Sequence, residues 1–257
     1  MKGRRPPSEV VYGANPVLEL LRVRLREVER VLVARERRAG VGPILRLARD
    51  AGIPVSHLAR DVLARMVGRS AAHQGIAAVV SPVPYADAAE LYARAAAERG
   101  LLVMLDGVTD PGNLGAIVRT AAAAGAVGVV LSGEGTVGLT PVVAKAAAGA
   151  LEHLPVAREA ALPKRLRDLR EDGFLAVALD GRADESWTEP DLTGCTILVA
   201  GGEGRGLRPG VQRACSTRVA IPLVSGVESL NVSVAIGVLL YEAVRQRRRP
   251  NPGLETS

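Results

Sequence analysis

The stretch of sequence that decides the fold is Cys195-Thr-Ile-Leu-Val-Ala-Gly-Gly-Glu-Gly-Arg-Gly206. Its apolar first half has the composition of a strand covered on both faces. Its second half is a glycine-rich turn around one carboxylate, and glycine serves where a backbone approaches a ligand closely or takes a positive φ. The stretch therefore predicts a small-molecule pocket built from main chain. It is no G-x-G-x-x-G fingerprint, because position 207 is Leu, and no P-loop.

Strands and helices alternate from residue 101 onward. The apolar runs at 101–105, 127–131, 174–179 and 197–199 are continuous, as in strands buried on both faces. Helical stretches lie at 114–124, 141–150 and 163–170, and a long last helix is expected at 230–249, with Val234, Val238 and Tyr241 on its apolar face. This order predicts an α/β fold, a parallel sheet layered with helices.

The front of the chain predicts a second, smaller α/β unit at 1–80. Helices are expected from Asn15 and from Pro43, and strands at 31–33, 53–55 and 76–80. Two prolines in Ser81-Pro-Val-Pro84 end this pattern, so we expect a linker at 81–98, a main domain at 99–249 and a tail at 250–257.

Composition favours a globular cytoplasmic protein. The chain has 257 residues, of which 48% are hydrophobic, and it contains neither a signal peptide nor an apolar run of membrane-spanning length. Cys195 and Cys215 have no C-x-x-C spacing and no histidine nearby, so we expect buried thiols and no metal site.

Positive charge is concentrated at the front. Residues 1–69 hold 15 lysines and arginines against 7 acidic residues, although the whole chain is only +6. A basic module beside a near-neutral one is typical of nucleic-acid binding, and an arginine-rich composition spread over solvated faces is the alternative. Only 6 aromatic residues occur, so we expect contacts to RNA phosphates rather than base stacking.

Three segments that follow strands carry candidate functional residues, where open α/β folds place their ligands. Asn113 is expected to cap a helix that bears Arg119, and Arg119 interrupts an apolar segment, so we expect it to be buried against an anion. Glu203 lies in the glycine turn. Ser229 is expected to cap the last helix, which also carries Asn231. The three histidines lie in separate segments, without a G-x-S-x-G serine, which argues against a hydrolase.

Together these segments resemble the SpoU (TrmH) family of S-adenosylmethionine-dependent RNA ribose 2′-O-methyltransferases, of the SPOUT class. The resemblance rests on Asn113-Leu-Gly-Ala-Ile-Val-Arg119, on Gly201-Gly-Glu-Gly-Arg-Gly-Leu207, and on Ile221-Pro-Leu223 with Ser229-Leu-Asn-Val-Ser233. It implies a C-terminal trefoil knot and a homodimer. The front unit is similar to L30e-like RNA-binding domains. Two of its segments, 11–18 and His73-Gln-Gly-Ile76, resemble the RlmB branch of the family, which modifies a guanosine of 23S rRNA.

The resemblance implies a role for each matching residue. Gly201, Ile221 and Leu230 would bind S-adenosylmethionine, mostly through backbone. The catalytic group would be Asn113, Arg119, Glu203, Ser229 and Asn231. Our hypothesis for their roles is that Arg119 grips the target phosphate and stabilises the developing alkoxide, that the other polar groups hold the ribose, and that Glu203 orients the arginine or the turn. Two departures lie outside these motifs: Ala147 stands where the family often has Ser, and Ala122 and Ala123 stand where the branch often has Asp.

Three alternatives stay open. The same chemistry could act on tRNA or on the thiostrepton-site adenosine of 23S rRNA. The chain could instead be an RNA- or ribosome-binding protein without catalysis. A Rossmann methyltransferase for a small molecule is the third, although Asp106-Gly-Val-Thr-Asp-Pro-Gly112 is a poor version of its glycine fingerprint.

Overall fold

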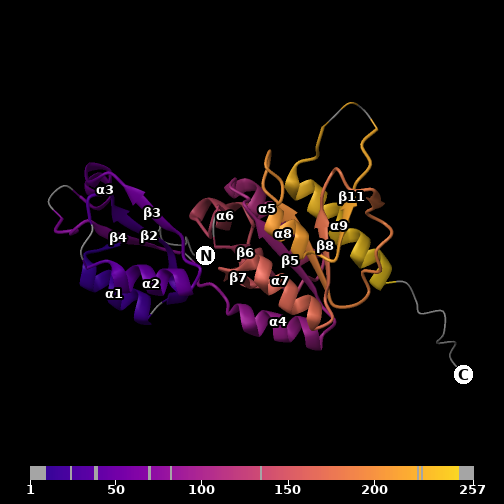
Figure 1. The fold of residues 1–257 in the computed structure, drawn as a ribbon, viewed down its shortest axis with the longest axis horizontal. Helices are drawn as coiled ribbons and strands as arrows, with labels where there is room; N and C mark the ends of the chain where they lie inside the picture. Colours follow the sequence, from indigo (N-terminus) through magenta and orange to yellow (C-terminus); the bar gives the residue numbers. More distant parts are fainter. Residues whose placement is uncertain are drawn as a thin grey trace, which may run out of the picture.

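The chain folds around two separate β-sheets (Figure 1), as seen in a computed structural model. The structure describes residues 10–23, 25–37, 40–68, 71–81, 83–133, 135–224, 226 and 228–248. The tail expected at 250–257 lies outside them. Within the described ranges, no helix has both the length and the apolar content needed to cross a bilayer.

The first sheet has the order β1-β4-β2-β3 and is mixed, since only β2 and β3 run parallel. Its elements are β1 (Val10–Tyr12), α1 (Ala14–Val23), the 3-10 turn η1 (Leu25–Glu27), β2 (Val28–Ala34), α2 (Gly42–Asp50), β3 (Val55–Leu58), α3 (Arg60–Val67) and β4 (Ile76–Val80). The core between sheet and helices includes Val17, Leu21 and Ile44. The sequence pattern missed β1 and α3, because β1 has 3 residues and α3 buries only Leu63.

The second sheet has seven parallel strands in the order β7-β6-β5-β10-β8-β11-β9. Its elements are α4 (Ala88–Ala97), β5 (Leu101–Asp106), α5 (Pro111–Ala123), β6 (Gly128–Ser132), α6 (Pro141–Ala146), η2 (Ala150–Glu152), β7 (Val156–Glu159), α7 (Leu162–Glu171), β8 (Leu175–Leu179), β9 (Glu185–Ser186), β10 (Thr196–Gly201), α8 (Pro209–Ala214), β11 (Thr217–Ala220) and α9 (Val232–Arg247). Every residue of β5 is buried, as the continuous apolar run predicted.

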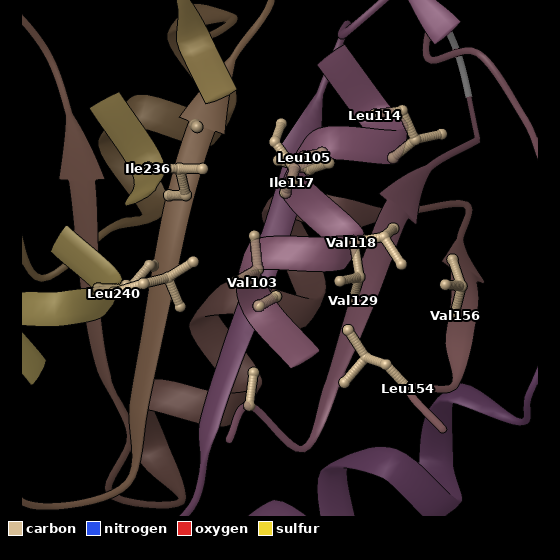
Figure 2. Close-up of a cluster of buried hydrophobic side chains, with 14 of the residues drawn as sticks. Val103, Leu105, Leu114, Ile117, Val118, Val129, Leu154, Val156, Ile236 and Leu240 are labelled. Atoms are coloured by element: carbon tan, nitrogen blue, oxygen red, sulfur yellow. The ribbon is translucent and has the colours of Figure 1, made fainter. Parts of the chain in front are cut away.

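Helices cover both faces of this sheet. Figure 2 shows the core under α5 and α9, where Val103 and Leu105 of β5 lie near Ile117 and Ile236. On the other face, α4, α7 and α8 pack over the alternate residues of the same strands, such as Met104. The α/β layering expected from the sequence is confirmed.

Two boundaries differ from the sequence expectation. Helix α4 lies inside the range predicted as a linker, but Leu91, Tyr92 and Ala95 are buried against the second sheet, so 81–87 alone connects the two units. The predicted apolar face of α9 is wrong: Val234 and Tyr241 are 53% and 52% exposed, and the opposite face packs into the core. Apolar residues of α9 lie on all sides of the helix, so their periodicity could not identify the buried side.

A buried polar network joins the two units. The Arg158 guanidinium, at the end of β7, donates to the carbonyls of Val28 and Glu29 at 2.7 Å each and pairs with the Glu29 carboxylate at 3.0 Å. Tyr85 donates its hydroxyl to Glu29 at 2.6 Å and accepts the Leu139 N–H at 2.8 Å. Burial raises the pKa of Tyr85, so this hydroxyl stays protonated and serves as a donor.

Candidate active site

The glycine turn after β10 fits only glycine at two positions. A Cβ at Gly202 would lie 1.9 Å from the Gly107 carbonyl oxygen, and one at Gly201 would lie 2.1 Å from the Gly206 carbonyl carbon. Gly202 donates its N–H to the Asp106 carbonyl at 2.9 Å and accepts the Gly206 N–H at 2.9 Å. The turn is therefore folded back on itself and pressed against the end of β5.

An ion pair between a buried carboxylate and a partly exposed arginine holds the base of this turn. The Asp106 carboxylate is 1% exposed and accepts Nε and Nη2 of Arg208 at 2.8 and 2.7 Å. Its second oxygen accepts the Arg208 backbone N–H at 3.0 Å. Sequence analysis missed both residues, and the available signal was a carboxylate directly after a fully apolar strand, where it needs a partner.

Three of the predicted catalytic residues meet beside the turn. Asn113 donates its amide to Glu203 Oε1 at 2.6 Å. Asn231 donates to the same oxygen at 3.1 Å and to Asn113 Oδ1 at 2.9 Å. One residue from each sequence motif thus forms a solvent-facing polar cluster at the carboxyl edge of β5 and β10.

Both predicted helix caps are wrong. Asp110 caps α5 and accepts the Asn113 N–H at 2.7 Å, and Asn231 caps α9 and accepts the Ser233 N–H at 2.9 Å. Asn113 lies inside the first turn of α5, so its side chain is available for the cluster. Ser229 lies in the exposed segment before α9.

Arg119 is exposed rather than buried, which contradicts the expectation. The helical repeat places Leu114, Ile117 and Val118 in the core and Arg119 on the outer side of α5. Within the part of the chain that the structure describes, no hydrogen bond or ion pair engages the Arg119 guanidinium. Glu203 therefore contacts the two asparagines rather than the arginine.

The three predicted cofactor residues border the same edge of the sheet. Gly201 ends β10, Ile221 follows β11 and packs against the core, and Leu230 precedes the cap Asn231. Leu223 and Leu230 are 39% and 37% exposed. Bare backbone and apolar surface next to amide groups suit a ligand with both a polar and an apolar part.

Comparison with known proteins shows which family has this site. The model of the SpoU rRNA methylase family matches residues 100–241, and that of RNA 2′-O ribose methyltransferase substrate binding matches 10–86. The chain belongs to the SpoU rRNA methylase family. An uncharacterized tRNA/rRNA methyltransferase of Mycobacterium sp. (strain KMS) is 40% identical over 94% of the chain and 77% of its own length.

Two further relatives cover nearly the whole chain. The 23S rRNA (guanosine-2′-O-)-methyltransferase RlmB of Shewanella oneidensis is 39% identical, over 94% of this chain and 98% of its own length. Among solved structures, the SpoU methyltransferase AviRb of Streptomyces viridochromogenes, in complex with AdoMet, has a TM-score of 0.59 at 29% identity, covering 93% of this chain and 90% of its own.

These findings settle the class of enzyme. The chain is an RNA 2′-O-ribose methyltransferase with the SPOUT fold, and S-adenosylmethionine as cofactor is confirmed at the level of the family. The alternatives of a non-catalytic RNA-binding protein and of a Rossmann methyltransferase for small molecules are therefore wrong.

Proposed function

We propose that this SpoU-family enzyme methylates the ribose 2′-oxygen of a guanosine in 23S rRNA. Support for the substrate comes from the RlmB relative, which aligns over 98% of its own length. The two RlmB-like segments of the front unit also lie together. Gly13 donates its N–H to the Ile76 carbonyl at 2.9 Å, and Ala14 donates to Gln74 Oε1 at 3.0 Å. The first segment begins in the edge strand β1, and the second ends in β4, with which β1 pairs.

The cluster of Asn113, Glu203 and Asn231 is the observation that carries the proposed site. Amide groups that are fixed by hydrogen bonds lose little freedom when they bind a ribose. Glu203 accepts both amide N–H groups, so it sets the orientation of the two asparagines. The proposed roles are therefore ribose positioning for Asn113, Asn231 and Ser229, and orientation of the amides for Glu203.

The cofactor residues present a surface that fits S-adenosylmethionine. Its sulfonium supplies a labile methyl group, so the protein needs to align the acceptor oxygen and exclude competing geometries. Gly201 would approach it through bare backbone, since even a Cβ there meets the main chain. Ile221 and Leu230 would contact it mainly through backbone, with exposed apolar side chains alongside.

Arg119 is proposed to bind the phosphate of the target nucleotide and to stabilise the developing alkoxide. Its exposed position, with no partner among the described residues, leaves all its donors available to an incoming anion. A guanidinium does not lose its proton in proteins, so we assign it electrostatic stabilisation rather than base catalysis.

Single-turnover methylation of a 23S rRNA transcript at saturating S-adenosylmethionine tests this assignment. Arg119→Ala is expected to slow transfer by about a hundredfold, in the range found when one transition-state donor is removed. Arg119→Lys retains the charge and is expected to recover part of the rate. The control is Arg167→Ala, which removes an exposed arginine from a different helix, α7. Near-normal rates for both Arg119 variants would refute the role.

Mapping 2′-O-methyl groups in cellular RNA with and without this protein tests the substrate. Loss of one guanosine methylation in 23S rRNA is the expected result. Loss at a tRNA position or at the thiostrepton-site adenosine would instead support one of the two related substrates. We propose that the enzyme acts in the cytoplasm, where these RNAs are made.

We also propose a homodimer, with the exposed face of α9 as part of its interface. Val234 and Tyr241 are each about half exposed on this face, and large exposed apolar groups on one helix commonly mark an interface. Val234→Lys with Tyr241→Lys is expected to halve the mass measured by light scattering. An unchanged mass of the double variant would show that this face of α9 is not part of the interface. A monomeric parent protein would refute the dimer itself.

A further inference from the structure

A cleft separates the two units beside the candidate active site. Its volume is about 790 Å³. Arg30, Arg49 and His57 line it from the first unit, and Thr109, Gly133 and Thr136 line it from the second. Residue 109 directly precedes the Asp110 cap of α5, so the cleft runs along the carboxyl edge of β5 and β6 toward Asn113.

The described lining of this cleft is positively charged. Arg49 is exposed and Arg30 half-buried, and neither guanidinium makes a hydrogen bond or ion pair with another described residue. The described lining residues include no carboxylate, and Glu134 lies outside the described part of the chain. Arginines that are held in a concave surface without a protein partner are suited to an anionic ligand.

The size and the chemistry of the cleft favour single-stranded RNA over a duplex. A volume of about 790 Å³ lies in the usual range for small-molecule sites, whereas an RNA duplex presents a broad surface. Phe, Tyr and Trp are absent from the described lining residues, and His57 is the one ring among them, so the cleft offers little surface for base stacking. Contacts would therefore go to phosphates and sugars, with little dependence on base identity.

The width of the cleft is fixed by the junction between the units. Arg30 follows Glu29 on β2, and Glu29 is bonded to Arg158 of the second unit and to Tyr85 of the connecting segment. Farther along, the main chains touch: a Cβ at Gly133 would lie 3.0 Å from the Gly52 carbonyl oxygen. The two arginines are therefore held at a set distance from the catalytic edge rather than on a free-swinging module.

We infer that this cleft binds the single-stranded RNA segment next to the target nucleotide, with Arg30 and Arg49 on its phosphates. The inference rests on the proposed RNA methyl transfer and names the path of the substrate strand. Arg30 and Arg49 are thus positioning residues. They hold the flanking backbone so that the target ribose reaches Asn113 and Asn231.

The test compares Arg30→Ala/Arg49→Ala with Arg22→Ala/Arg46→Ala, which removes the same charge from α1 and α2 outside the cleft. Methyl transfer to a 23S rRNA transcript is measured with labelled S-adenosylmethionine, together with RNA binding at several salt concentrations. The cleft variant is expected to raise KM for RNA by about tenfold or more and to lower the salt slope by about 1.4, the single-strand value for two phosphates. KM for S-adenosylmethionine and the control variant should stay within about twofold of the parent protein, as for changes that touch no phosphate.

A charge-reversing and a charge-keeping variant support the test if the double alanine variant folds poorly. Arg49→Glu, at an exposed position, is expected to weaken RNA binding more than Arg46→Glu, and Arg49→Lys to retain most of it. Equal effects of the cleft and control variants, in a parent enzyme that methylates RNA, would overturn the inference. A parent enzyme that methylates neither rRNA nor tRNA would instead overturn the proposed function.

Discussion

Replacing Arg158 with methionine should strongly destabilise the junction between the two units. Methionine keeps most of the side-chain length but removes both carbonyl hydrogen bonds and the 3.0 Å ion pair with Glu29. The side chains of Arg158 and Glu29 are only 6% and 7% exposed, so the remaining carboxylate would be buried without a cation. Breaking a buried pair in this way costs about 3–5 kcal/mol.

A matched pair nearby separates this effect from the general loss of an arginine. Arg165 pairs with Glu159 at 3.0 Å, but the Arg165 side chain is 40% exposed and that of Glu159 13%, so water reaches the cation of this pair. A solvent-exposed pair contributes about 0–1 kcal/mol. Urea unfolding, followed by circular dichroism, should therefore show a much larger loss for Arg158→Met than for Arg165→Met.

The companion change Glu29→Gln identifies the cause. In the Arg158→Met background it removes the unpaired charge, so the double variant should be more stable than the sum of the single losses predicts. The coupling energy should be about 1–3 kcal/mol, as for residues in one network. If Arg158→Met lost no more stability than Arg165→Met, the junction would be hydrated and the reasoning on a fixed cleft would be refuted.

Three more changes test the site and the core. Gly202→Ala should abolish S-adenosylmethionine binding in calorimetry, because its Cβ would lie 1.9 Å from a backbone oxygen. Gly204→Ala has no neighbour within 4 Å but a positive φ, so it should cost about 1 kcal/mol of stability. Equal binding of the cofactor by both variants would contradict the turn geometry. Asp106→Asn should weaken cofactor binding about tenfold or more, because the charge-assisted bonds to Arg208 are lost. The kcat at saturating cofactor should change little. A lower kcat with unchanged cofactor affinity would argue that Asp106 does not position the glycine turn. Burial raises the pKa of Cys215 to about 12. The unfolded chain therefore releases this proton from about pH 8.5 while the folded chain retains it, so the free energy of unfolding should fall as pH rises across that window. The decline should be smaller in Cys215→Ala, and equal pH profiles of the two proteins would disprove the shift.

The sequence predicted the parts of the fold that depend on local pattern. Continuous apolar runs correctly indicated a parallel sheet, and the spacing of Gly201 and Gly202 correctly indicated a main-chain turn, because a side chain at either position would meet backbone. The motifs also identified three side chains that meet, Asn113, Glu203 and Asn231. Their roles in catalysis stay predictions.

Other features depend on tertiary contacts that a single sequence does not reveal. Asp110, Asn113, Ser229 and Asn231 are all good capping residues by type, so composition alone could not choose between them. Arg119 was predicted to be buried because its neighbours in sequence are apolar, yet the helical repeat turns it outward. The Glu29–Arg158 pair joins residues 129 positions apart, and no local pattern announces such a contact.

The central position of β10 has a consequence for synthesis. This strand pairs with β5 and β8 on its two sides, although it follows both in the chain and lies far in sequence from β5. A nascent chain that ends before it would carry two open sheet edges, which attract other strands. The first unit can fold while translation continues, but the second unit cannot complete its sheet until the last quarter of the chain has been made. Prematurely terminated products should therefore aggregate rather than retain partial activity.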